Sequence, residues 1–271
     1  MATDIRHRLS ALGWQTISAF IGARHWAGFW LTIACLHSVP VIAEQVSVAV
    51  AANFAEPLRQ LAAEFNKDSG HQLQAAIAST GTFYAQIRAG APFDILLAAD
   101  EQTPARLEKE GLGVAGSRFT YANGKLLLWS RSTTLVDPQG AVLQGENFRH
   151  LAVANPRLAP YGAAAFAVLK AFGLTETLRH KLVMGENAGQ TYQFVVSGNA
   201  ELGFIALSQV ARAGHWHSGS GWLVPPALYP PIRQDAVLLV NGRSKTAAEA
   251  FLAYLRSEKA KTIIRSFGYD I

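Results

Sequence analysis

Cysteine is nearly absent from this chain, and its scarcity narrows the possible chemistry. The 271 residues contain a single cysteine, Cys35. This residue lies in an N-terminal segment with the features of a leader, so a chain cleaved after Ala43 would have no cysteine. Disulfide bonds and thiol catalysis are then excluded, and the mature chain suits an oxidising compartment.

Charged residues are also scarce. Only 16% of residues are charged and 50% are hydrophobic, which predicts a large buried core and excludes a disordered chain. Loss of the leader, with three arginines and one aspartate, lowers the net charge from +5 to +3. The sequence has no stripe of basic residues interleaved with aromatics, so nucleic acid is not an expected partner. A weakly positive field would help to gather small anions.

Enzyme motifs are missing as well. No GxSxG, P-loop or HExxH pattern occurs, and the best acid/base or metal candidates form no constellation: Asp94, Asp100, Glu101, His215 and His217. Asp94 begins a predicted strand and Asp100 precedes a predicted helix, so turn or capping roles fit them better. The two histidines stand in a Gly/Ser-rich loop without further ligands at zinc-like spacing. We therefore expect neither an enzyme nor a cofactor.

Residues 1–43 have the composition of a secretory signal peptide. Three arginines precede a short apolar run over residues 27–36, and the segment ends in small residues from Val41 to Ala43. The apolar run is too short to span a bilayer. Lipid attachment at Cys35 matches poorly, because Thr32 stands three residues before it. Export to a bacterial periplasm is the expected location.

Beyond residue 45, short apolar runs alternate with helical patterns. Strands are predicted over 46–52, 72–78, 94–99, 151–155, 181–185, 202–207 and 235–240. Helices are predicted over 54–67, 82–89, 161–172, a segment ending at Val196, 246–255 and 258–267. This alternation predicts α/β sheets with parallel crossovers, whose ligands bind beyond the carboxyl ends of the strands.

The alternating elements fall into two blocks that we expect to form two lobes. The chain would cross between them within 119–130 and again within the Pro-rich segment 225–232, and the last helices would pack on the first lobe. The expected division is 1–43 signal peptide, 44–123 and 237–271 lobe 1, and 124–236 lobe 2.

In the first block, two strands end in polar residues at a helix start. Asn53 follows the strand 46–52 as an expected N-cap, with Glu56 three residues on as in a capping box. The second strand is followed by Ser79, Thr80 and Gly81, where hydroxyls either cap the helix or donate to an oxyanion. Free amide groups at such helix starts form potential anion sites.

The second block carries its own pair of such loops. Pro160 and Gly162 shape the first loop around Tyr161. Ala188 and Gly189 leave backbone N–H groups open in the second, with the Asn187 side chain nearby. None of the four loops has an arginine clamp or carboxylate cluster at its tip, and Arg88 and Arg157 are expected to be solvated. A cleft lined by these loops would bind an anion through dipoles.

These residues resemble the periplasmic molybdate-binding proteins of ABC transporters. The resemblance covers residues 46–271, and its most specific parts are VAANF, ASTGTFYAQIRAGAPFDILLAAD, SRFTYANGKLLLWS, NPRLAPYG and GENAGQ. It implies a two-lobed type II periplasmic-binding-protein fold, with a mixed sheet flanked by helices in each lobe and the ligand in the interlobe cleft. The implied function is capture of molybdate or tungstate and delivery to a membrane permease, with sulfate or a small organic anion as the alternative ligand.

The resemblance also assigns ligand positions. Asn53 and Thr80 match those of the first lobe, and Tyr161 and Ala188 match those of the second; Ala52, Ser79, Asn187 and Gly189 adjoin them. Ala52 stands where a close relative has a hydroxyl, and Ala206 where some members have a tyrosine, which makes Tyr161 the expected phenol donor. The oxyanion would be bound through its oxygens without protein–metal bonds, by a monomer. Nothing in the sequence separates molybdate from tungstate.

Overall fold

The computed structural model describes residues 43–271, which fall within one compact unit. The predicted signal peptide, Cys35 included, lies outside these residues except for Ala43. Among the helices of the described part of the chain, none has the length and apolar character needed to cross a membrane.

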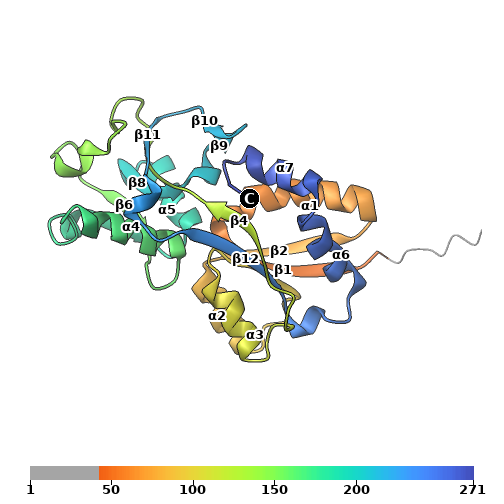
Figure 1. The fold of residues 1–271 in the computed structure, drawn as a ribbon. Helices are drawn as coiled ribbons and strands as arrows, with labels where there is room; N and C mark the ends of the chain where they lie inside the picture. The colour runs from red at the N-terminus through yellow and green to blue at the C-terminus, as the bar shows by residue number, and fades with distance from the viewer. Residues whose placement is uncertain (1–42) are drawn as a thin grey trace, which may run out of the picture. The chain divides into compact units, whose positions relative to one another are not determined.

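The first sheet contains the N-terminal strands. Its order is β2-β1-β3-β12-β4, and Figure 1 labels all of these strands except β3. The strands are β1 (Gln45–Ala51), β2 (Gln72–Ala78), β3 (Ile95–Leu97), β4 (Phe119–Gly124) and β12 (Ile232–Leu238). β1 pairs in parallel with β2 and β3, whereas β12 is antiparallel to β3 and β4.

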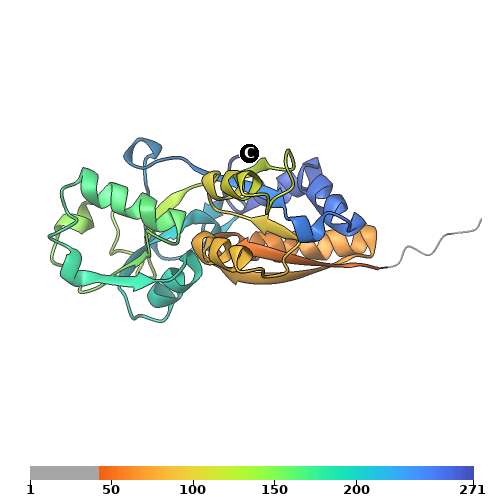
Figure 2. The same ribbon diagram turned by 90° about the horizontal axis from the view of Figure 1, so that it is seen from below.

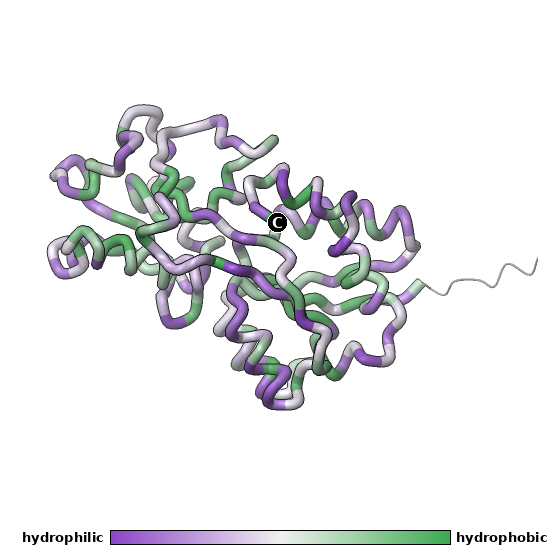
Figure 3. The backbone as a smooth tube through the Cα atoms, viewed as in Figure 1, coloured by the Kyte–Doolittle hydropathy of each residue, from purple (hydrophilic) through white to green (hydrophobic). Residues whose placement is uncertain are grey.

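Helices cover both faces of this sheet. α1 (Ala55–Ser69), α6 (Thr246–Leu255) and α7 (Glu258–Ser266) pack on one face, and α2 (Thr80–Arg88) and α3 (Gln102–Lys109) pack on the other. β1 is therefore almost wholly buried, which explains its unbroken run of small and β-branched residues. Figure 3 shows hydrophobic residues concentrated in the strands. The last helices pack on the first lobe, as expected.

The second sheet has the order β11-β5-β8-β6-β7. Its strands are β5 (Leu126–Ser130), β6 (Leu151–Ala154), β7 (Leu182–Gly185), β8 (Leu202–Ala206) and β11 (Ser220–Leu223). β6 is parallel to β7 and β8, and β5 is antiparallel to β8 and β11. α4 (Pro160–Ala171) and α5 (Ala188–Val196) lie on opposite sides of this sheet (Figure 2).

Several short elements complete the fold. β9 (Ala211–Arg212) and β10 (His215–Trp216) form a separate hairpin. Six short 3-10 helices also occur within residues 43–271: η1 (Ala52–Phe54), η2 (Ala141–Gln144), η3 (Arg179–Lys181), η4 (Leu207–Gln209), η5 (Pro226–Leu228) and η6 (Val240–Gly242).

The chain crosses between the two sheets twice. The first crossing is at Lys125, between β4 and β5, inside the segment predicted for it. The return crossing lies between β11 and β12. Strand pairing places all of β12 in the first sheet from Ile232 onward, whereas the predicted boundary assigned residues up to 236 to the second lobe.

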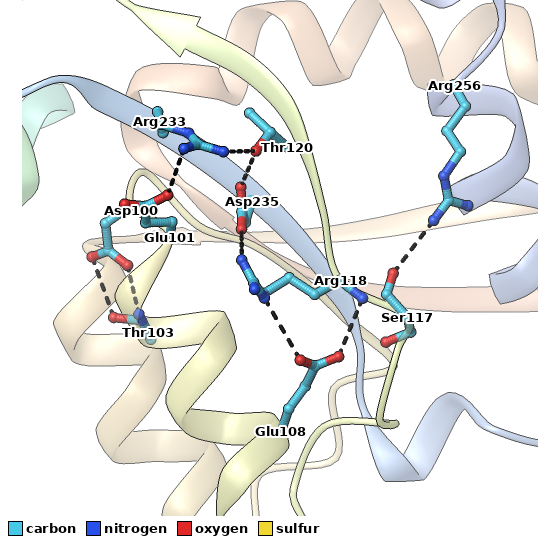
Figure 4. A network of polar contacts seen from close by, with 10 residues as sticks. All are labelled: Asp100, Glu101, Thr103, Glu108, Ser117, Arg118, Thr120, Arg233, Asp235 and Arg256. Atoms are coloured by element: carbon cyan, nitrogen blue, oxygen red, sulfur yellow. Dashed lines mark hydrogen bonds and ion pairs between the residues drawn. The ribbon is translucent and has the colours of Figure 1, made fainter.

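A polar network explains this early return of β12 to the first sheet. Asp235 is fully buried, and its carboxylate accepts from Arg118 Nη1 at 2.5 Å and Thr120 Oγ1 at 2.7 Å (Figure 4). Arg118 also faces Glu108 of α3 at 3.6 Å. A β-bulge between Gln234 and Asp235 shifts the register there, and such a shift re-aims side chains. β12 is thereby fixed to β4 and α3.

The predicted fold class is confirmed: both sheets are mixed and flanked by helices. All predicted strands and helices are present. The segment 119–130, predicted as a crossing, consists mostly of two strands. β4 and β5 belong to different sheets, and the crossing itself is limited to Lys125 between them.

Candidate functional site

A small cavity lies where elements of both lobes meet. Its volume is about 10 Å³, roughly the space that one water molecule needs. Its lining is Ala51, Ala52, Asn53, Ser79, Thr80, Ala99, Ala159, Pro160, Tyr161, Asn187 and Ala188. No lining residue among the described part of the chain carries a formal charge.

The cavity contains seven of the eight positions predicted from the sequence. Asn53, Thr80, Tyr161 and Ala188 all line it, as do Ala52, Ser79 and Asn187. Gly189 lines an adjoining cavity instead. The four predicted loops do converge, because each follows a strand whose carboxyl end faces the junction of the sheets.

Three α-helices begin at the cavity. Thr80 is the first residue of α2, Tyr161 is the second of α4, and Ala188 is the first of α5. The first amides of an α-helix have no intrahelical acceptor and carry the positive end of the helix dipole. Amides from both lobes therefore meet at one small, uncharged cavity, which is an arrangement suited to an anion.

Thr80 offers a hydroxyl donor. Its Oγ1 accepts a hydrogen bond from the Ala99 amide at 2.9 Å, and its side chain is almost fully buried. A hydroxyl that accepts in this way still has its own proton to donate. Thr80 and Ala99 both line the cavity.

Ser79 and Asn187 cap the helices that follow them. Ser79 Oγ accepts from the Thr82 amide at 3.2 Å and lies 2.6 Å from Thr82 Oγ1. Asn187 Oδ1 accepts from the Gln190 amide at 2.9 Å. These side chains satisfy amides of the first helical turn, so their main contribution is to hold the helix starts in place.

The second lobe presents backbone amides to the cavity. In α4, Gly162 and Ala163 donate to Ala159 O at 2.9 and 3.2 Å, whereas the Tyr161 amide makes no hydrogen bond within residues 43–271. In α5, the Thr191 amide donates to Asn187 O at 3.1 Å. The Ala188 amide lies at the start of the helix, where amides have no intrahelical acceptor. The other lining side chains of this lobe are mostly apolar.

The prediction that Asn53 caps the first helix is wrong. Asn53 lies inside η1, and its side chain makes no cap bond; Glu56 pairs with Arg59 instead of forming a capping box. Asn53 Nδ2 donates to Gln234 Oε1 at 2.9 Å and to Tyr269 Oη at 3.0 Å. Both amide protons are thus used, because an amide has only two donors.

The Tyr161 hydroxyl also differs from the expectation of a phenol donor. Tyr161 Oη accepts from Gln234 Nε2 at 3.2 Å and lies beside Gly124, where an added Cβ would be only 2.1 Å from it. Neither Gln234 nor Gly124 lines the cavity. The hydroxyl end of Tyr161 therefore lies behind the site, and its amide is the group that remains for a ligand.

Gln234 is the centre of a buried polar network that sequence reasoning missed. Tyr121 Oη donates to the same Gln234 Oε1 at 3.1 Å, so Gln234 joins Asn53, Tyr121 and Tyr161. Burial raises the pKa of Tyr121 and Tyr161 well above the usual value. The phenols stay neutral, so no phenolate opposes an anion. In the sequence, the signal for this network is the polar pair Gln234 and Asp235, which directly precedes the apolar residues of β12.

Tyr269 and Ser208 extend this network to the backbone of the site. Ser208 Oγ donates to Asn53 O at 2.8 Å, and Tyr269 Oη lies 2.9 Å from Ser208 Oγ. Burial raises the pKa of Tyr269 to about 12. Ser208 belongs to η4, after β8 of the second sheet, so these bonds join the two lobes behind the cavity. Neither residue has a motif that would have identified it.

The carboxylates considered as catalytic candidates have structural roles. Asp94 pairs with Lys245 Nζ at 2.7 Å and accepts from the Ser47 amide at 2.8 Å. Asp100 accepts from the Thr103 amide at 2.8 Å, and burial raises its pKa. Glu101 faces Arg233 at 3.3 Å (Figure 4).

The remaining candidates lie outside the cavity. His215 and His217 are exposed, and the described residues contain no cluster of three or more side chains able to hold a metal ion. Arg88 is exposed and pairs with Glu110 at 3.8 Å. Arg157 is exposed and, with Asp100, lines a larger neighbouring cavity of about 270 Å³.

Relatives with similar sequences are named as molybdate-binding proteins. The chain is 55% identical to the molybdate-binding protein ModA of Azotobacter vinelandii over 84% of this chain and 91% of the relative. It is 47% identical to that of Rhodobacter capsulatus over 86% and 90%, respectively.

A solved structure agrees with these matches. The periplasmic molybdate-binding protein of Azotobacter vinelandii superimposes with a TM-score of 0.81 and 42% identity, covering 83% of this chain and 99% of that protein. The sequence profile described as "Bacterial extracellular solute-binding protein" matches residues 46–270. The chain therefore belongs to the bacterial extracellular solute-binding proteins.

Proposed function

We propose that this protein captures molybdate, and tungstate equally, in the cavity between its lobes and delivers the oxyanion to the permease of an ABC transporter. The observation that carries the proposal is the uncharged cavity at which helix starts from both lobes present amides beside the Thr80 hydroxyl. The molybdate-binding relatives support the choice of ligand.

Neutral donors are sufficient for tight binding. An unpaired oxyanion in a desolvated cavity costs on the order of tens of kcal/mol, so each ligand oxygen needs donors. Micromolar to nanomolar affinity corresponds to about 8 to 12 kcal/mol. Each charge-assisted hydrogen bond contributes about 1.5 to 3 kcal/mol, so about three to eight placed donors are needed.

The proposed donors follow from the hydrogen bonds already made. Thr80 contributes its hydroxyl, and Tyr161 and Ala188 contribute their amides. Asn53 contributes its backbone amide, because its side-chain protons are donated to Gln234 and Tyr269. Ser79 and Asn187 hold the helix starts, Ala52 lines the cavity, and Gly189 stands beside it.

A cavity of donors also selects among oxyanions. Hydrogen phosphate brings an O–H that would face another donor, whereas fully ionised molybdate, tungstate and sulfate bring only acceptors. The size of the closed cavity must then separate sulfate from the two larger ions. Molybdate and tungstate are nearly isosteric, so the same donors fit both.

The remaining parts of the proposal follow from this binding mode. The metal is bound through its oxygens, so no protein–metal bond, cofactor or catalytic residue is required. The protein acts as a monomer in the periplasm after export. Membership of the extracellular solute-binding family supports this location.

Isothermal titration calorimetry of residues 44–271, stripped of ligand, tests the proposal. Titration with molybdate, tungstate, sulfate and phosphate should give tight one-to-one heats for the first two ions and none for phosphate. Sulfate binding alone would reassign the site to that ion, and no heat with any of the four would exclude the oxyanion function.

A further inference from the structure

The two lobes touch at glycines on either side of the cavity. Gly81 is the second residue of α2 and Gly189 is the second residue of α5. Each directly follows a residue that lines the cavity, Thr80 or Ala188. Each also faces the opposite lobe, so the same helix start that meets the ligand meets the other half of the protein.

The contact at Gly81 is a close backbone approach. Its amide donates to Leu158 O, in the second lobe, at 2.9 Å. A Cβ added at Gly81 would lie 3.0 Å from Leu158 Cα and 3.1 Å from Leu158 O. Both are backbone atoms, which cannot turn aside as the end of a flexible side chain can.

The Leu158 loop has little freedom to retreat. The amides of Leu158 and Ala159 both donate to Asn155 O, at 3.1 and 2.9 Å, and the Arg157 amide donates to Asn155 Oδ1 at 3.0 Å. This loop leads through Pro160 directly to the Tyr161 amide. A displacement of Leu158 would therefore move a proposed ligand donor away from Thr80.

The contact at Gly189 is similar but looser. A Cβ there would lie 3.3 Å from Ala52 Cβ, in the first lobe, and 3.0 Å from Asn187 Oδ1. The first distance opposes closure, and the second presses on the cap of α5. The distance between the lobes is therefore limited at two contacts, one at a glycine of each lobe.

We infer that Gly81, with Gly189 as its counterpart, is a positioning residue whose missing side chain sets how closely the lobes shut around the oxyanion. This inference rests on the proposed function. Neither glycine has the positive φ that would require glycine for backbone reasons. Alanine is moreover the better helix former, so helix formation does not explain glycine at either position.

The test compares Gly81→Ala with wild type and with Gly145→Ala as a matched control. At Gly145 an added Cβ meets nothing closer than Val142 O at 3.4 Å, and its φ is −97°. Calorimetry with sodium molybdate gives the affinity, stopped-flow dilution gives the dissociation rate, and thermal melting of the ligand-free protein reports stability.

Gly81→Ala should bind molybdate about ten- to a hundredfold more weakly, the equivalent of one lost charge-assisted hydrogen bond. The change should lie in faster dissociation. The ligand-free melting temperature should not fall, because without a ligand the lobes can part at Leu158 and alanine itself suits the helix. Gly189→Ala should weaken binding less, and Gly145→Ala should match wild type.

Three results would overturn the inference. Gly81→Ala could bind as wild type does, it could lower affinity and ligand-free stability together, or Gly145→Ala could lose affinity to the same extent. Absence of molybdate binding by the wild-type protein would instead overturn the proposed function, and the inference with it.

Discussion

The two lobes face the same cavity with different chemistry. Each lobe lines it with three apolar residues, but the first adds Thr80, whose hydroxyl accepts from Ala99 and keeps its own proton, whereas the polar side chains of the second, Tyr161 and Asn187, are held by Gln234 and the Gln190 amide. The second lobe therefore relies on backbone amides. A site built in this way should be sensitive to side-chain changes in one lobe and to amide removal in the other.

Polar residues that line a cavity can also have their side chains held by partners outside its lining. Asn53 and Tyr161 looked like ligand side chains, yet their polar ends join Gln234. Thr80 differs from both, because its hydroxyl accepts from the Ala99 amide, which belongs to another lining residue, and keeps its own proton. The remaining lining side chains shape the cavity or hold its helices.

Among changes in the first lobe, Thr80→Val should weaken molybdate binding most. It removes the hydroxyl donor and leaves the buried Ala99 amide without its acceptor. We expect affinity for molybdate to fall by about 1.5–3 kcal/mol and the free energy of unfolding by about 1–3 kcal/mol. Calorimetry and denaturant unfolding measure the two effects, and Thr80→Ser should preserve both. Wild-type affinity in Thr80→Val would remove the hydroxyl from the site.

Ala188→Pro tests the amides of the second lobe. Proline is tolerated at the first position of a helix, and Asn187 before it is extended, with φ −151° and ψ 172°, so the fold should persist. Loss of this one N–H should weaken molybdate binding by about 1.5–3 kcal/mol. Ala188→Ser keeps the amide and serves as the control. If the proline variant bound as tightly as the serine variant, the amide would not contact the ligand.

Gln234→Leu should act mainly on stability. It leaves the buried polar groups of Asn53, Tyr121 and Tyr161 without their shared partner. The expected loss in the free energy of unfolding is about 1–3 kcal/mol, measured by denaturant unfolding, with a smaller loss of affinity. An affinity loss larger than that of Thr80→Val would mean that Gln234 itself acts on the ligand.

Tyr161→Phe should have the smallest effect on binding. It keeps the amide and removes only a hydroxyl that accepts from Gln234. We expect affinity within about threefold of wild type, below the roughly tenfold that a lost charged hydrogen bond would cause. A tenfold or greater loss, measured by calorimetry, would restore the phenol as a ligand donor.

Most of the fold was predictable because its signals are local. The apolar runs and helix starts of β1, β2, β6 and β7 identify the strands, and their carboxyl ends identify the edge where ligands bind. The resemblance to molybdate-binding proteins then identified the lining positions. Their convergence could be predicted because loops at the ends of parallel strands share one edge.

The roles of individual polar groups were not predictable, because they depend on partners distant in sequence. Asn53 has the local signature of a cap, but Gln234 and Tyr269 lie 181 and 216 residues away. These partners provide a buried network that replaces capping. The Tyr161 hydroxyl is likewise positioned by the space beside Gly124, and Asp235 of β12 is paired with Arg118, which is 117 residues away.

A crystal structure of residues 44–271 with molybdate would test the central claim most directly. The account predicts ligand oxygens within about 2.7–3.1 Å of Thr80 Oγ1 and of the Tyr161 and Ala188 amide nitrogens. Tyr161 Oη and Asn53 Nδ2 should remain on Gln234. Ligand oxygens bound instead by the Tyr161 phenol, or by a charged side chain such as Arg157, would contradict it.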